Sequence, residues 1–187
     1  MRKLLAVMLT FILAAFFTTS LSAGEHGQRL LPFHAHFAGP VLGFIEDTTM
    51  IEARCTDVPD GKAAWAIAFF KGWGNATHAG SSSIEANHCS YGFPGVDEFG
   101  QPVIFPDGTY GQGLISFEAA NGDILLATYD NGASDMELNF MDEFTFVDGG
   151  TGRFKFASGY GVEMGSVDFG DFTFVIEVSG VISYKRK

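Results

Sequence analysis

The chain has 187 residues, of which 22 are acidic and 11 are Lys or Arg, so its formal net charge at pH 7 is −11. A protein this acidic repels nucleic acid and anionic lipid headgroups, which argues against both as partners. Its length suits one domain with a sizeable hydrophobic core.

The first 23 residues have the pattern of a secretory signal peptide. Arg2 and Lys3 precede an apolar run over residues 4–17, and small residues follow as far as Ala23. The run is shorter than the roughly 20 residues of a membrane span, so an uncleaved anchor helix is the weaker interpretation. We therefore predict cleavage near Ala23, a secreted or periplasmic location, and a β-barrel domain over residues 24–187 with no membrane association after cleavage.

Two histidines lie close together at the start of the predicted domain. His34 and His36 alternate with apolar residues, so they share one face of a predicted strand. Such a pair could bind a metal with a third ligand, but an exposed strand face is the simpler interpretation. We predict no metal site and no cofactor.

The chain contains two cysteines, Cys55 and Cys89. In an oxidising compartment, a bridge that closes a loop of about 35 residues is worth roughly 4 kcal/mol on the chain-entropy model. Two buried thiols or a metal pair are the alternatives, but the sequence shows no zinc-type spacing. We predict a Cys55–Cys89 disulfide.

Apolar and polar residues alternate along several segments of the domain. In residues 64–73, Trp65 and Phe69 share one parity, and alanines occupy the other; residues 172–178 alternate in the same way. A period of two indicates half-buried strands. Strands at this spacing, with 24 glycines and 20 phenylalanines, indicate an antiparallel sandwich or a closed barrel.

Turn residues separate these strands. Asn121-Gly122 lies between the runs 113–119 and 123–129, and predicts a tight hairpin. Residues 92–108 are rich in Gly, Pro and Asp, and are predicted to form a long loop that could act as a flap over a barrel mouth.

Asp142 interrupts an apolar row and is the candidate catalytic residue. The row consists of Leu138, Phe140, Phe144 and Phe146. A carboxyl group that points into the lumen with this row would have a raised pKa, which suits a general acid. A bulge that turns Asp142 outward beside Glu143 is the alternative, and both interpretations stay open.

Residues 147–161 contain a glycine-rich run, Asp148-Gly149-Gly150-Thr151-Gly152. A phosphate-binding loop needs a helix after it, with Lys and Ser or Thr at the helix start. Here Arg153-Phe154-Lys155-Phe156 follows, which the pattern predicts to continue as a strand. The glycines are therefore predicted to turn a hairpin corner.

The same glycine-rich stretch continues through Phe154 to Ala157-Ser158-Gly159. It resembles a signature of the allene oxide cyclase and dirigent barrel superfamily. Segments 72–80, 119–123 and 180–184 are also similar to secreted bacterial members of that group. The resemblance runs from about residue 33 to the C-terminus. It implies an eight-stranded antiparallel barrel with an apolar cavity, often as a homo-trimer, but it does not assign catalytic residues by a local motif.

Two functions are compatible with these features. The first is the binding of a small hydrophobic molecule in the lumen, with Trp65, Phe69, Phe140 and Phe144 as ligand-binding candidates. The protein would in addition be an isomerase or cyclase if it folds a reactive lipid-like or polyketide-like substrate in that pocket, because such chemistry needs shape and desolvation more than many catalytic groups. The second is a non-catalytic binding or structural role, in a secreted barrel whose lumen is filled by its own side chains.

Overall fold

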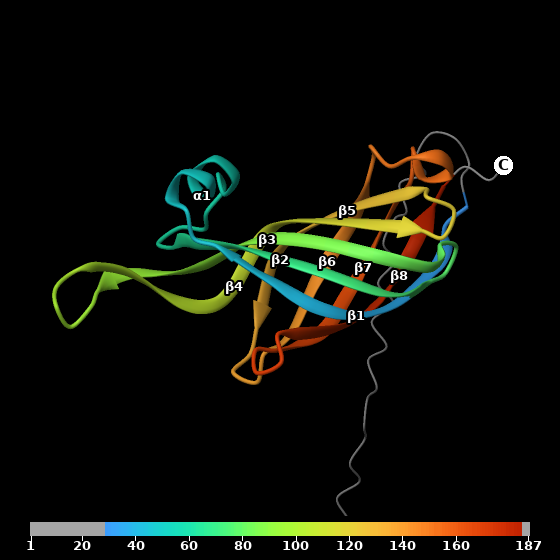
Figure 1. Cartoon of the computed structure of the whole chain (residues 1–187). Helices are drawn as coiled ribbons and strands as arrows, with labels where there is room; N and C mark the ends of the chain where they lie inside the picture. The colour runs from blue at the N-terminus through green and yellow to red at the C-terminus, as the bar shows by residue number, and fades with distance from the viewer. Residues whose placement is uncertain (1–28, 185–187) are drawn as a thin grey trace, which may run out of the picture.

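A computed structural model describes residues 29–184, which form a closed barrel of eight antiparallel strands (Figure 1). Each strand pairs with the next one in the chain, and β8 pairs with β1 to close the barrel. The strands are β1 Leu31–Ile45, β2 Ala63–Ala76, β3 Gly80–Val96, β4 Pro102–Ala119, β5 Ile124–Ser134, β6 Asn139–Val147, β7 Ser158–Asp168 and β8 Thr173–Ser183. The prediction of an all-β, eight-stranded antiparallel barrel is confirmed.

The predicted signal peptide, residues 1–23, lies outside the described residues. Within residues 29–184, no helix has the length and hydropathy that a membrane span requires.

Glycines on one strand make room for aromatic rings on the next. In the pairing of β6 with β7, Phe140 lies opposite Gly165 and Phe144 lies opposite Gly161. A Cβ atom at either glycine would come within 2.6 Å of the facing phenylalanine ring. The inward rings of β6 can therefore lie flat over β7, which explains why a chain with many phenylalanines also needs many glycines.

One half of the barrel interior is filled by phenylalanine side chains; we call it the filled end. Its five central rings are each at most 3% exposed, and they are Phe33, Phe37, Phe117, Phe144 and Phe146. Their ring centroids lie 5.0–6.3 Å apart, mostly in edge-to-face contacts. Close aromatic packing of this kind leaves no space for a ligand at this end.

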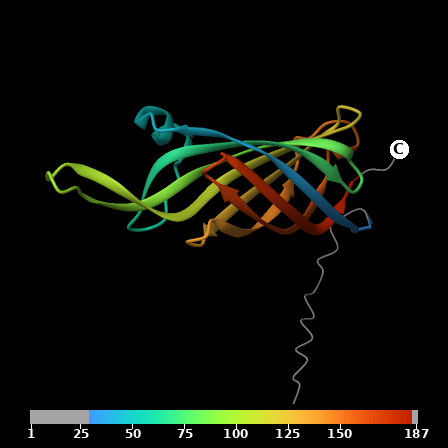
Figure 2. The same ribbon diagram turned by 60° about the horizontal axis from the view of Figure 1, so that its bottom comes forward.

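Residues 92–108 form a hairpin arm and not a loop. β3 and β4 stay paired from Gly92 and Pro106 out to Val96 and Pro102. Beyond Gly92, β3 no longer pairs with β2, and before Thr109, β4 does not pair with β5. Figures 1 and 2 both show the arm projecting beyond the barrel, on the same side as the helix α1. The prediction of a long flap-like loop is wrong, because a two-stranded ribbon with free edges tolerates the Gly and Pro residues that usually indicate a loop.

The glycine-rich segment also differs from the prediction after its turn. Gly152–Phe154 form a 3₁₀ turn, η1, and β7 begins only at Ser158, so Arg153 to Phe156 do not continue as a strand. Gly152 has a φ of +54°, and a Cβ atom there would collide with the Asp123 carboxylate. The glycines thus shape the corner between β6 and β7, and Arg153 Nε lies 3.7 Å from Asp123 Oδ2.

The connection between β1 and β2 carries the short helix α1, Thr48–Arg54, which is fixed to the barrel wall. Asp47 caps the helix by accepting a hydrogen bond from the Met50 amide at 2.9 Å. The predicted Cys55–Cys89 disulfide is present, with the two Cα atoms 5.8 Å apart. Arg54 donates to Asn87 Oδ1 at 3.1 Å and to the backbone oxygen of Gln112. A disulfide of this kind is compatible with an extracellular location.

Candidate functional site

The other half of the barrel, which we call the hollow end, encloses a cavity of about 340 Å³. It lies at the end of the barrel that carries α1 and the β3–β4 arm (Figure 1). Most of its wall is apolar or aromatic, including Phe44, Trp65, Ala68, Phe70, Ile84, Ala86, Phe140, Val167, Phe174 and Ile176. Phe169 both lines the cavity and is 42% exposed, so the cavity reaches the surface at the β7–β8 turn.

Two carboxyl groups form the polar part of the wall. Asp142 on β6 and Glu163 on β7 are cross-strand partners, and both side chains point inward, at 5% and 4% exposure. Tyr110 donates a hydrogen bond from its hydroxyl to Asp142 Oδ2 at 2.7 Å. We call Asp142 and Glu163 the carboxyl pair.

Burial controls the titration of the carboxyl pair. It raises the pKa of Asp142 to about 6, although hydrogen bonds with Tyr110 and Glu163 act in the opposite direction. Burial also raises the pKa of Glu163 well above its usual range, and the nearby charge of Asp142 raises it further. The pair therefore loses its protons in two steps, and the first falls near neutral pH.

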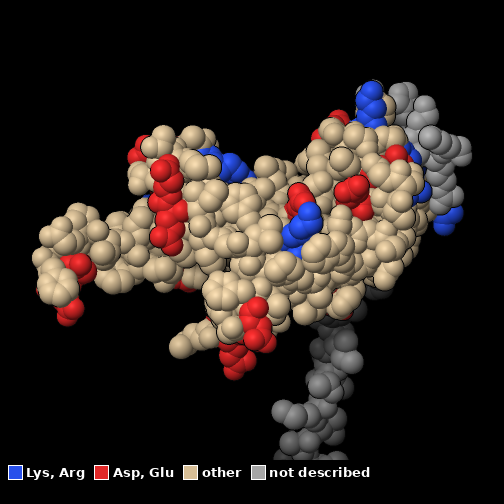
Figure 3. Space-filling model, viewed as in Figure 1, with Lys and Arg blue, Asp and Glu red and all other residues tan. Residues whose placement is uncertain are grey.

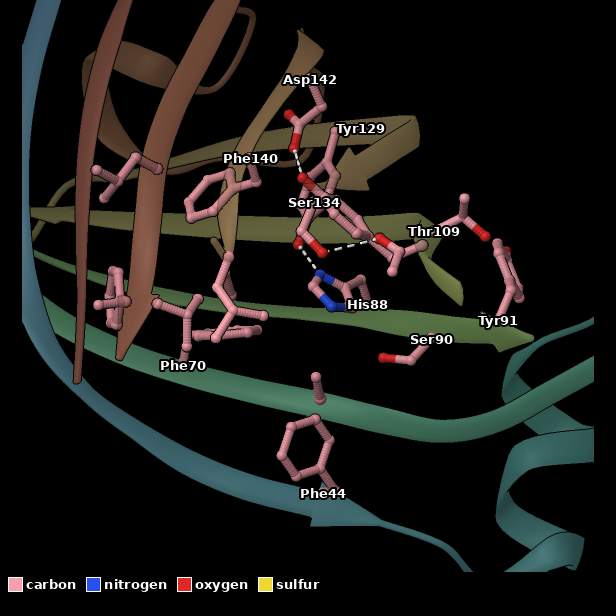
Figure 4. A pocket seen from close by; sticks show the side chains of 18 of the residues that line it. Phe44, Phe70, His88, Ser90, Tyr91, Thr109, Tyr129, Ser134, Phe140 and Asp142 are labelled. Atoms are coloured by element: carbon pink, nitrogen blue, oxygen red, sulfur yellow. Dashed lines mark hydrogen bonds between the residues drawn. The ribbon is translucent and has the colours of Figure 1, made fainter. Parts of the chain in front are cut away.

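His88, Tyr110 and Tyr129 form an aromatic wall beside the carboxyl pair. The His88 ring stacks on Tyr110 with a centroid separation of 4.3 Å, and its Nδ1 lies 2.8 Å from the Tyr129 hydroxyl (Figure 4). Burial, together with the charge of Arg54, lowers the pKa of His88 to about 3, so this imidazole is neutral at pH 7. Burial raises the pKa of both tyrosines. His88, Tyr110 and Tyr129 therefore stay uncharged near neutral pH, whereas the carboxyl pair titrates there.

The structure brings together only part of the residue set predicted from the sequence. Trp65 and Phe140 line the cavity, together with Asp142. Phe144 points inward but belongs to the filled end. Phe69 packs outside the lumen, against the cluster around the disulfide.

A bulge explains the different positions of Trp65 and Phe69. The register between β2 and β3 shifts between Ala64 and Ala66, so that Trp65 is the extra residue. Trp65 stacks on Phe44 and donates from Nε1 to the Tyr91 carbonyl at 3.1 Å, whereas beyond the bulge Ala68 and Phe70 face the lumen. Strict alternation across a bulge assigns residues to the wrong face.

Sequence reasoning missed Glu163 and the aromatic wall. Glu163 stands between Gly161 and Gly165 at the inward positions of β7, so it interrupts no apolar row that would mark it as buried. The only available signal was its register opposite Asp142, which appears once the β6–β7 pairing is known. Asp142 itself points inward, and the outward bulge considered as an alternative does not occur.

The predicted histidine pair lies on the outer face of the barrel. His34 and His36 are exposed, and His36 Nδ1 lies 2.6 Å from Glu177 Oε1 on the neighbouring strand. Within the described residues, no cluster of His, Cys, Asp or Glu has the arrangement of a metal site. On the face shown in Figure 3, acidic side chains form separate groups and basic ones are few.

Comparisons with family models, with curated proteins and with solved structures find no match for this chain.

Proposed function

We propose that the protein is a secreted barrel that binds a small, mostly apolar molecule in its hollow end. The observation that supports this most directly is the cavity of about 340 Å³, bordered by aromatic side chains and one polar wall. Burial of ligand surface at roughly 25 cal/mol per Å² supplies the binding free energy, from which the costs of association are subtracted. The resemblance to the allene oxide cyclase and dirigent superfamily supports the same proposal, and it adds a homo-trimeric assembly.

Filling the cavity should weaken this binding strongly. Ala86 lines the hollow end on β3, so Ala86→Phe would place a ring in the space that a ligand needs. We expect titration with N-phenylnaphthylamine, an uncharged apolar fluorophore, to show saturable binding to the wild-type protein. The affinity of the Ala86→Phe variant should be weaker by about tenfold or more.

The matched control is Ala120→Phe, because Ala120 is exposed in the β4–β5 turn at the filled end. This variant should bind the fluorophore like the wild type. Equal binding by all three proteins would place the fluorophore outside the lumen, and the absence of saturable binding to the folded wild type would contradict the proposed function.

A second candidate function, an isomerase or cyclase of a lipid-like or polyketide-like substrate, is favoured by Asp142. Its pKa of about 6 lets the carboxyl group exchange a proton near neutral pH while it faces an apolar pocket. A general acid at that position could protonate an oxygen of a reactive substrate, and the walls would hold the chain in a folded shape.

Asp142→Asn should separate catalysis from binding. The amide can still accept the Tyr110 hydrogen bond, so we expect the variant to fold and to bind N-phenylnaphthylamine with wild-type affinity. An unsaturated fatty-acid epoxide is a suitable test substrate, because uncatalysed ring closure gives equal amounts of mirror-image products and closure in a chiral pocket does not. The wild type should give an excess of one product at a rate above that of the uncatalysed reaction, and Asp142→Asn should lose this rate increase. A racemate from both proteins would contradict the catalytic function, and ligand binding would be the remaining proposal.

A further inference from the structure

The carboxyl pair presents hydrogen-bond acceptors that no other residue reaches. Asp142 Oδ1 and Glu163 Oε2 are buried, and no described residue outside the pair donates a hydrogen bond to either atom. The adjacent Tyr110 hydroxyl is already engaged, since it donates to Asp142 Oδ2. An unsatisfied buried acceptor is costly, so a ligand group that donates hydrogen bonds here would be complementary to the site.

The charge of the carboxyl pair is also unbalanced. None of the ion pairs between described residues includes Asp142 or Glu163. With the pKa of Asp142 at about 6 and that of Glu163 higher, the pair retains one proton at neutral pH and carries roughly one negative charge. The carboxyl pair lost its hydration water when the protein folded. A bound cation is therefore attracted to the pair without a further cost for desolvating the carboxyl groups.

Two hydroxyls on the polar wall are engaged within the protein. Thr109 donates from Oγ1 to Asp107 Oδ1 at 2.6 Å, and Ser134 donates from Oγ to the Gly108 carbonyl at 3.1 Å. These two hydroxyls are therefore not offered to an acceptor on a ligand. A ligand carboxylate would in addition meet the negative carboxyl pair. The charge of the pair thus disfavours acidic ligands and favours cations.

The surroundings of the carboxyl pair favour a cation as well. Tyr110, Tyr129 and Phe140 line the same cavity, and aromatic faces attract ammonium groups. The turns that border the hollow end, β5–β6 and β7–β8, carry four exposed acidic residues: Asp135, Glu137, Asp168 and Asp171. With a net charge of −11, the protein attracts cations to this opening.

We propose that the ligand of the hollow end is an amphiphilic amine, whose ammonium group binds the carboxyl pair and whose apolar part lies among the aromatic side chains. This inference rests on the proposed function and narrows its ligand class. The ammonium donates to the two carboxyl oxygens that no residue outside the pair reaches, Asp142 Oδ1 and Glu163 Oε2. The hydrocarbon part occupies the space beside Phe70, Ala86 and Phe174.

The test compares three ligands of equal length that differ in one end group. Octylamine, octanol and octanoate each compete with N-phenylnaphthylamine for the cavity, at about pH 7.5, where the carboxyl pair is charged. We expect octylamine to bind at least about tenfold more tightly than octanol, because a hydrogen bond to a charged group is worth more than a neutral one. Octanoate should bind more weakly than octanol.

Asp142→Asn should lower the ratio of the octylamine affinity to the octanol affinity, because it removes one of the two carboxyl groups that bind the ammonium. The matched control is Glu143→Gln, the adjacent residue on β6, which is exposed on the outer face. This control removes one negative charge from the protein without touching the cavity, so it should keep the preference.

The pH dependence of wild-type binding provides an independent measurement. Lowering the pH to about 5 protonates the carboxyl pair but leaves an alkyl amine charged, so the preference for octylamine should decline. The other groups around the pair do not titrate in this range: His88 on β3 has a pKa of about 3, and the pKa values of Tyr110 on β4 and Tyr129 on β5 are raised. Arg54 on α1 is a further charged group near this wall, since its charge acts on His88.

The outcomes separate this inference from the proposed function. If N-phenylnaphthylamine and octanol bind but octylamine has no advantage at about pH 7.5, the amine proposal is wrong and the hydrophobic-binding function stands. The same conclusion follows if the preference persists unchanged in Asp142→Asn or at about pH 5. If no apolar compound binds the folded protein, both proposals fail.

Discussion

Phe117→Ala is expected to lower the free energy of unfolding by about 3–5 kcal/mol. Phe117 is 1% exposed, and its ring contacts Phe33, Phe37 and Phe146 at centroid distances of 5.7–6.3 Å. The filled end has no spare volume, so the substitution removes buried apolar surface and leaves a new cavity. Equilibrium denaturation with urea, followed by far-UV circular dichroism, measures the loss.

Phe140→Ala is the matched control, because Phe140 belongs to the hollow end and already borders empty space. Its side chain is only partly buried, so we expect a smaller loss of about 1–2 kcal/mol. Similar losses for the two variants would show that the two halves of the barrel are packed alike, contrary to the structure described here.

The Cys55→Ser/Cys89→Ser double variant is expected to lose about 4 kcal/mol of stability. The bond joins positions 34 residues apart and ties the end of α1 to the middle of β3. Without it, the β1–β2 connection gains freedom in the unfolded chain. The small cluster of Ile51, Ile67 and Tyr91 around the two cysteines also loses its covalent support.

Urea denaturation with and without reductant provides the control for this prediction. Reductant should destabilise the wild type to the level of the double variant and should leave the double variant unchanged. A wild type that is insensitive to reductant, although its thiols become accessible to alkylation, would mean that the bridge adds little stability. Because Tyr91 also lines the cavity, the double variant should in addition bind N-phenylnaphthylamine more weakly.

Much of the fold was predictable from local pattern. Alternation correctly identified β6 and β8 as strands, and Asn121-Gly122 correctly identified the turn before β5. The strand pattern left a sandwich and a closed barrel as alternatives. The choice of a barrel and the number of strands were implied only by the resemblance of four segments to a known barrel superfamily. Local pattern describes each strand, but the pairing of β1 with β8 depends on residues more than a hundred positions apart.

The candidate site was less predictable, for two physical reasons. Parity identifies the face of a strand but not the depth along the barrel, so Phe140 and Phe144 looked equivalent although they belong to the hollow and filled ends. In addition, the cavity depends on cross-strand register. Glu163 becomes a notable residue only because β7 places it opposite Asp142. A single sequence contains neither kind of information in its local pattern.

A crystal structure of the protein with N-phenylnaphthylamine would show whether the hollow end binds an apolar ligand. We expect electron density for the fluorophore inside the barrel, in contact with Phe70, Phe140 and Phe174, while the filled end around Phe117 stays unchanged. Density for the fluorophore only on the outer surface would contradict this expectation. A hollow end closed by inward movement of these aromatic side chains would contradict it equally.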